Sequence, residues 1–125
     1  MLVEHFAAIL WVTGAITATP ALQFLAPRQV LAMMYRIELT DEAGLLWARH
    51  WGLLAASFGG LLMFAAGHPE VRPAVVAAAL VEKAGLVVAV AVALVRRRPF
   101  ARGLRLAVVF DTACVLLYAA WLATS

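Results

Sequence analysis

The stretch "AALVEKAGLVV", residues 78–88, places Glu82 and Lys83 side by side in a segment otherwise built from Ala, Val, Leu and Gly. The surrounding segment, 73–95, carries no other charge. As a helix rising ~1.5 Å per residue, it is long enough to cross a hydrocarbon layer of ~30 Å. Adjacent residues on a helix point ~100° apart, so we expect Glu82 and Lys83 to face different neighbours and not each other.

The composition of the whole chain is typical of a membrane protein. The chain has 125 residues, 66% of them hydrophobic, and a mean hydropathy of +0.95. Only 14% of the residues are charged, against about 25% in soluble domains. So few polar residues leave too little polar surface to coat a water-soluble globule. The length is enough for a single domain, 1–125.

Four apolar segments predict the fold. Each is close to the ~20 residues that a transmembrane helix needs, and the strict polar–apolar alternation of a membrane barrel is absent from the sequence. Short connections make successive helices antiparallel neighbours. We therefore predict an all-α integral membrane four-helix bundle with up-down-up-down order. The expected helices cover about 3–25, 43–67, 71–96 and 102–124.

Two further patterns concern how these helices are connected and packed. The long connection 26–42 mixes Met, Leu and Tyr with Arg, Glu and Asp, which predicts an amphipathic segment in the membrane interface. In the second helix, Gly52, Ala56 and Gly60 recur every four residues. Such a stripe of small residues lets another helix approach closely. We therefore expect this face of the second helix to be a helix–helix contact.

Arginines predict the orientation of the bundle. The stretch "RRRPFARGLR", residues 96–105, holds five Arg and no acid, and Arg28 and Arg36 lie in the first connection. The second connection has only Arg72. By the positive-inside rule, the first and third connections face the cytoplasm of a bacterial inner membrane and both termini face outward.

The same arginines indicate a lipid partner and no nucleic acid. The net charge is only +3, and the basic residues gather at helix ends, where anionic lipid head groups lie. A topology signal alone is the alternative reading. A homo-oligomer or a larger membrane complex is also compatible with the sequence. The arginines expected to meet head groups are Arg96, Arg97, Arg98, Arg102 and Arg105.

Charged residues inside the apolar segments form the candidate site. From the cytoplasmic ends, Arg49 and His50 lie ~6–8 Å deep, Asp111 ~12 Å and Lys83 and Glu82 ~18–20 Å. An unpaired ion at such depth costs at least ~2.5–3.5 kcal/mol. Because the signs of Arg49 and Lys83 cancel those of Glu82 and Asp111, we expect one shared polar cluster. Asp111 would bridge the two cations, and Glu82 would face His50, Ser57, water or a ligand.

Other polar residues are weaker candidates. Asp111, Cys114 and Tyr118 share one face of the fourth helix, so Cys114, Tyr118 and Ser57 are secondary members of the site. A single Cys excludes an internal disulfide. Thr13 and Thr17 make the first helix slightly polar, which is more often packing than a site. The alternative for the whole cluster is a set of ion pairs that lock the helix register without any chemistry.

We predict no metal or haem. His5 and His68 both fall at the outer face, where two His side chains would be available as ligands. Neither belongs to a local ligand motif. A quinone is the one cofactor that we consider.

Three stretches carry a resemblance to a known group of proteins. They are "RHWGLL" (49–54), "VEKAG" (81–85) and "FDTACVLLYAAWL" (110–122). With the hydropathy pattern, they resemble the small four-helix bacterial membrane proteins of the DoxX-like group. This resemblance implies membrane redox, quinone or thiol chemistry at a polar site formed by Arg49, His50, Glu82 and Asp111.

Three functions are compatible with these observations. The first is binding of, or action on, a small apolar molecule of quinone or isoprenoid type. The second is proton-coupled transport, because ionisable groups are staggered from the cytoplasmic side to the midplane. The third is a non-catalytic subunit or scaffold, because the sequence has no catalytic motif. The sequence does not decide whether the protein is an enzyme.

Overall fold

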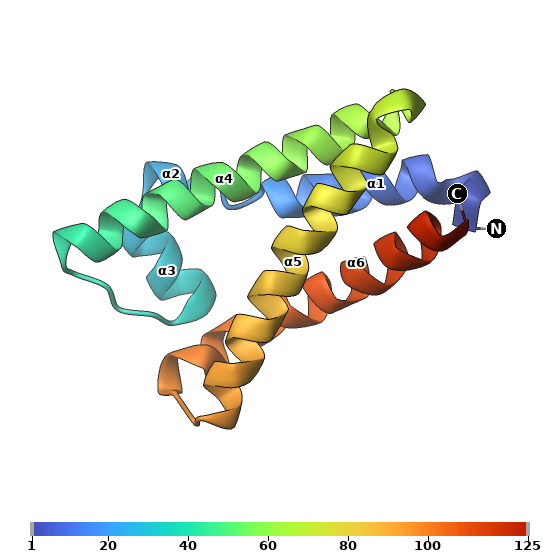
Figure 1. Ribbon diagram of the computed structural model, residues 1–125. Helices are drawn as coiled ribbons and strands as arrows, with labels where there is room; N and C mark the ends of the chain where they lie inside the picture. Colours follow the sequence, from blue (N-terminus) through green and yellow to red (C-terminus); the bar gives the residue numbers. More distant parts are fainter. Residues whose placement is uncertain (1, 125) are drawn as a thin grey trace.

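A computed structural model describes residues 2–124 and is built from helices, which confirms the all-α class (Figure 1). Short 3-10 turns, Pro69–Val71 and Pro99–Leu104, precede the last two long helices. The α-helices are α1 (Leu2–Ala18), α2 (Ala21–Leu25), α3 (Pro27–Tyr35), α4 (Glu42–Ala66), α5 (Arg72–Val95) and α6 (Arg105–Thr124).

The long helices alternate in direction along the chain. Figure 1 shows α1 and α4 side by side, while α5 crosses away from α4 toward the turn Pro99–Leu104 and α6 returns. The most extensive helix contacts are those of α1 with α4 and of α5 with α6. As a result, both termini lie at one end of the molecule and the arginine-rich turn lies at the other.

The first expected helix, 3–25, is divided into α1 and α2 at Pro20. Proline has no N–H to donate and its ring displaces the carbonyl four residues earlier, here that of Ile16. That carbonyl accepts hydrogen bonds from the Thr19 backbone N–H (3.1 Å) and the Thr19 Oγ1 hydroxyl (2.7 Å) instead. The break at Pro20 is therefore hydrogen-bonded, and it turns the chain toward α3.

Small residues bring α4 into backbone contact with α1 and the Pro20 turn, but of the four-residue repeat that predicted this contact only Gly52 lies on the contact line. A Cβ added to Gly59 would lie 2.5 Å from the Ala18 nitrogen and 2.6 Å from the Gly14 oxygen. Gly52 and Ala55 are buried on the same line, whereas Gly60 is exposed with open space beside it. The contact follows the 3.6-residue period of the helix, and a strict four-residue spacing drifts away from that line.

The end of the molecule that carries the termini is closed by aromatic side chains. Phe6 stacks on Trp121 with ring centroids 4.5 Å apart, and meets Tyr118 edge-on at 6.2 Å. All three are buried, and Leu62 and Val76 complete this core from α4 and α5. The packed rings join α1 to α6.

Three helical segments of the described chain are long and apolar enough to span a membrane: Leu2–Leu25, Pro69–Val95 and Pro99–Thr124. This agrees with a membrane protein. The fourth expected span, α4, has 25 residues but is not among them. Arg49 and His50 lower its hydropathy, so spanning by α4 stays a prediction.

Neighbouring glycines on α4 provide a matched test of the α1–α4 contact. We expect Gly59→Ala to lower the free energy of unfolding by about 1–3 kcal/mol, because backbone atoms of α1 occupy the space of the new methyl group. Gly60→Ala should be neutral or stabilising by up to about 1 kcal/mol, since it gains helix propensity in open space. Thermal unfolding of both variants in detergent micelles measures the difference. Equal melting temperatures for the two variants would contradict this packing.

A buried ion pair and a cavity

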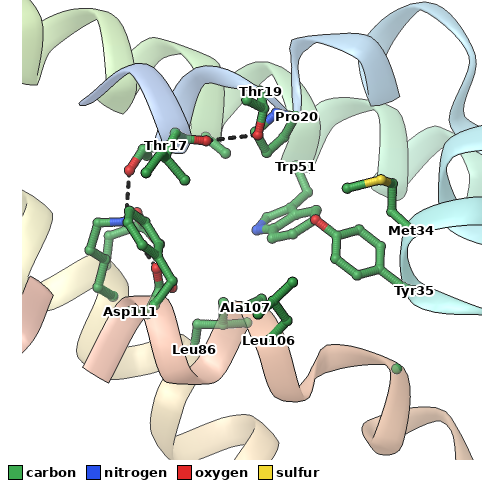
Figure 2. A pocket seen from close by; sticks show the side chains of 16 residues that line it. Thr17, Thr19, Pro20, Met34, Tyr35, Trp51, Leu86, Leu106, Ala107 and Asp111 are labelled. Carbon is green, nitrogen blue, oxygen red and sulfur yellow. Dashed lines mark hydrogen bonds and ion pairs between the residues drawn. The ribbon is translucent and has the colours of Figure 1, made fainter. Parts of the chain in front are cut away.

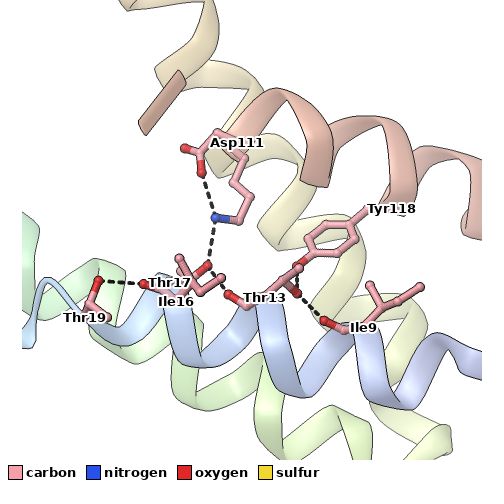
Figure 3. Close-up of polar contacts among 8 residues, drawn as sticks. Ile9, Thr13, Ile16, Thr17, Thr19, Asp111 and Tyr118 are labelled. Atoms are coloured by element: carbon pink, nitrogen blue, oxygen red, sulfur yellow. Dashed lines mark hydrogen bonds and ion pairs between the residues drawn. The ribbon is translucent and has the colours of Figure 1, made fainter. Parts of the chain in front are cut away.

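The centre of the candidate site is an ion pair between α5 and α6. The Lys83 ammonium donates to Asp111 Oδ1 at 3.0 Å, and the two side chains are 2% and 8% exposed (Figure 3). It is the one ion pair among residues 2–124. Two opposite charges in contact cancel most of the field that each would project into the apolar surroundings. The predicted pairing of these two residues across helices is confirmed.

A threonine of α1 completes the environment of Lys83. The ammonium also donates to Thr17 Oγ1 at 2.9 Å, and lies 4.8 Å from the centroid of the Phe110 ring. Thr17 gives its own hydroxyl hydrogen to the Thr13 carbonyl at 2.6 Å. Its oxygen therefore presents only lone pairs to Lys83, as a cation requires. Three helices thus meet at one ammonium group.

A second polar contact lies further along α1, toward the termini. Thr13 Oγ1 and the Tyr118 hydroxyl are 2.6 Å apart, and Thr13 Oγ1 also lies 2.7 Å from the Ile9 carbonyl (Figure 3). Tyr118 and Cys114 are buried on the same face of α6 as Asp111. The predicted polar face of α6 is therefore confirmed, and Tyr118 satisfies its hydroxyl within the bundle.

Glu82 occupies a different position from Lys83. It is half-buried and lines a cavity, and within residues 2–124 it makes no hydrogen bond or ion pair. As predicted, it does not pair with Lys83. Gly85, three residues further along α5, is exposed with open space around it, so α5 makes no close helix contact at this position in the described chain.

Arg49, His50 and Ser57 are not part of the cluster, although the sequence analysis placed them there. All three are exposed. His50 meets the ring of Trp47 at 6.4 Å, and Ser57 donates to the Leu53 carbonyl.

The reason lies in the contact line of α4. That line runs through Ala48, Gly52, Ala55 and Gly59, where the Ala48 carbonyl accepts a hydrogen bond from Gln23 Nε2 of α2 at 2.6 Å. Arg49 follows Ala48 by one residue and so points ~100° away from α1 and α2. Two residues after Ala48 and Ala55, His50 and Ser57 point ~200° away from that line. The contact of α4 with α1 and α2 is made by small residues, and α4 contributes no charge to the cluster.

The ion pair forms one wall of a cavity of about 160 Å³. Figure 2 shows Thr17 and Asp111 on one side of this cavity, and Tyr35 with Trp51 facing them from the other. Besides the threonines, Tyr35 and the three charged residues, the cavity is lined by apolar side chains. The apolar and aromatic lining residues include Met34, Trp51, Leu86, Leu106, Ala107 and Phe110.

The far wall depends on a close approach between α3 and the turn Pro99–Leu104. A Cβ on Gly103 would overlap the carbonyl of Tyr35, so only glycine allows this contact. The Tyr35 hydroxyl makes no hydrogen bond with any other described residue and points into the cavity (Figure 2). Burial, and then the negative charge of Asp111, raise the pKa of Tyr35 above its ordinary value. The hydroxyl is therefore a hydrogen-bond donor at neutral pH.

Sequence reasoning missed Tyr35, Trp51 and Thr17 as members of the site. Tyr35 lies in the long connection, and nothing in its sequence neighbourhood shows that α3 packs against the turn Pro99–Leu104. Thr17 gives a partial signal, since Thr13 and Thr17 are four residues apart and share a helix face. Two threonines four residues apart, at the same membrane depth as Lys83, form the sequence pattern that would have identified Thr17 as a partner of Lys83.

The described residues contain no group of three or more His, Cys, Asp or Glu that would hold a metal ion. His5 is exposed, and His68 stacks on Phe64 with centroids 3.9 Å apart while its Nδ1 lies 2.8 Å from the Phe64 carbonyl. Cys114 is buried and free. No protein-family model, curated protein or solved structure matches the chain. The resemblance to DoxX-like proteins stays a prediction.

The ion pair is tested by a double-mutant cycle. Removing one partner leaves the other charge buried alone, so we expect Lys83→Met and Asp111→Leu each to lower the free energy of unfolding by about 3–5 kcal/mol. The double variant Lys83→Met/Asp111→Leu should unfold close to the native chain, because no charge is then left unpaired. Chemical denaturation in mixed micelles gives all four values. Additive losses in the double variant would show that the two charges do not compensate each other.

Proposed function

We propose that the protein is a multi-pass protein of the bacterial inner membrane in which all four long helices span the bilayer in up-down-up-down order. Three described segments have the length and hydropathy to do so. The alternating helix directions, with both termini at one end and five arginines at the other, support a cytoplasmic location for the first connection, 26–42, and for the arginine-rich turn between α5 and α6, with the termini outside.

We further propose that the cavity binds a small apolar molecule of quinone or isoprenoid type. The observation that carries this proposal is the combination of an apolar cavity with the one described ion pair in its wall. A cavity of about 160 Å³ has the size of one that takes up a single six-membered ring, about 150 Å³. Apolar pockets with a few convergent polar groups are the usual form of small-molecule sites.

Each polar residue has a distinct role in such binding. The Tyr35 hydroxyl is a free donor for a carbonyl or hydroxyl oxygen of the ligand. Lys83 is held by Asp111 and Thr17, so this ion pair presents a local dipole, and not a net charge, to the ligand. Glu82, half-buried and without a partner in the described chain, is available to exchange a proton with a bound head group. The resemblance to DoxX-like proteins associates this site with redox chemistry.

The aromatic core argues against the second candidate function, proton-coupled transport. Phe6, Tyr118 and Trp121 close the end opposite the arginine-rich turn, and the Thr17 hydroxyl is committed to a backbone carbonyl. A continuous path across the molecule would need both to rearrange. This arrangement supports a binding site reached from one side. A scaffold role is supported by no feature of its own in the described residues.

Ligand binding is tested by thermal shift with a matched pair of variants on α6. Ubiquinone and menaquinone analogues and a prenol should be added to purified protein. A ligand present at one hundred times its Kd stabilises the native state by about 2.7 kcal/mol. We expect Ala107→Leu, which fills the cavity, to remove this shift, and Ala113→Leu, on the exposed face, to retain it. If no quinone or isoprenoid raises the melting temperature of the native chain, the binding proposal fails.

Cysteine labelling tests the orientation separately. Glu38→Cys should react with a membrane-impermeant maleimide only in inside-out vesicles, and Glu70→Cys only in intact spheroplasts, because the two exposed positions lie in connections at opposite ends. The native thiol of Cys114 is buried and gives little background. Labelling of both positions from the same side would exclude the proposed topology.

A further inference from the structure

Seven arginines occupy the end of the molecule opposite the termini, and we refer to them together as the arginine platform. Two come from α3 and its end, and five from the turn between α5 and α6, which packs against α3. Every one is exposed, and none takes part in an ion pair within residues 2–124. The platform consists of Arg28, Arg36, Arg96, Arg97, Arg98, Arg102 and Arg105.

Two platform residues have a backbone conformation that normally favours glycine. Arg36 and Arg97 have φ of 54° and 56° and are the only non-glycine residues with positive φ in the described chain. Each ends a helix: Ile37 N donates to the Leu31 carbonyl after α3, and Arg98 N donates to the Ala93 carbonyl after α5. Helices that end in this way usually carry glycine at the left-handed position.

The presence of arginine at both positions indicates a requirement for the side chain. A Cβ in the left-handed region is unfavourable, and glycine would remove that strain. A cation does interact well with a helix C-terminus, but Arg96 and Arg98 already stand beside the end of α5. Helix capping alone therefore does not explain the third guanidinium at Arg97. Strained residues that persist without a structural need often belong to binding sites.

The surroundings of the platform fit a membrane surface better than bulk water. Phe100 is 52% exposed, Leu106 80%, Val95 82% and Met33 81%. These side chains alternate with the arginines along the turn and α3. Apolar side chains that enter the acyl boundary, beside cations that stay at head-group level, are the pattern of an interfacial segment. Guanidinium groups also match the geometry of phosphate oxygens, since they donate two parallel hydrogen bonds.

We propose that the arginine platform binds the head groups of anionic phospholipids, and that Arg36 and Arg97 are retained at glycine-type positions for this contact. The proposal rests on the membrane placement described above and is independent of the ligand in the cavity. It goes beyond a topology signal, because a topology signal counts positive charges near a helix end and does not require them at strained positions.

The test compares lipid retention with stability. Native protein is reconstituted in nanodiscs of equal phosphatidylglycerol and phosphatidylcholine, extracted gently, and its bound lipids are counted by native mass spectrometry. We expect enrichment of phosphatidylglycerol in the native chain and about a fivefold weaker preference for each arginine removed. Arg36→Gly and Arg97→Gly should each show this weaker preference while their melting temperatures in phosphatidylcholine stay equal to, or rise above, that of the native chain.

Two controls separate the alternatives. Arg72→Gln removes one positive charge at the opposite end, where Arg72 donates to the Ala65 and Ala66 carbonyls, so it should lower stability and leave lipid preference unchanged. Soluble glycerol phosphate, at the same phosphate concentration, should not displace the lipid. Equal retention of both lipids by the native chain, or unchanged preference in Arg97→Gly and Arg36→Gly, overturns the proposal. Full displacement by glycerol phosphate assigns the platform to soluble anions and overturns it as well.

Discussion

The contact between Lys83 and Asp111 is the constraint on which the arrangement of α1, α5 and α6 depends. Each side chain is buried among apolar residues, where a charge without a partner is costly. The pair can form only when α5 and α6 are in one register. Because Lys83 also donates to Thr17, the same register fixes α1. Hydrophobic packing alone would tolerate a helix sliding by one turn, whereas this contact would not.

Helix α4 is held by close backbone packing, whereas α5 and α6 are held to α1 by polar side-chain contacts. Gly59 brings the backbones of α4 and α1 together, so dispersion between closely packed atoms replaces hydrogen bonds between side chains. A helix packed so closely has no room for charged groups on its inner face. The polar cluster is therefore made by the other long helices, and the cavity lies where α5 and α6 diverge from α4 toward the arginine-rich turn.

Sequence reasoning predicted correctly those features for which any other arrangement would cost much free energy, such as apolar surface in water or an unpaired buried charge. The apolar segments identified the long helices, and the burial of opposite charges identified Lys83 with Asp111. It was wrong for Arg49, because one residue along α4 changes the direction of a side chain by ~100° and the contact line begins at Ala48. It missed Tyr35, because its position depends on a tertiary contact at Gly103 that no local pattern encodes.

The cavity and the arginine platform share the same structural support, which links the two proposed sites. Gly103 lies in the arginine-rich turn and packs directly against the carbonyl of Tyr35, at the end of α3. Arg36 follows Tyr35 directly, so an anionic head group bound at Arg36 would restrain the residue that forms the far wall of the cavity. Ordering that wall before a ligand arrives reduces the entropy lost on binding. In this arrangement the lipid would act on ligand affinity through α3, while the ion pair at the opposite wall stays fixed by helix packing.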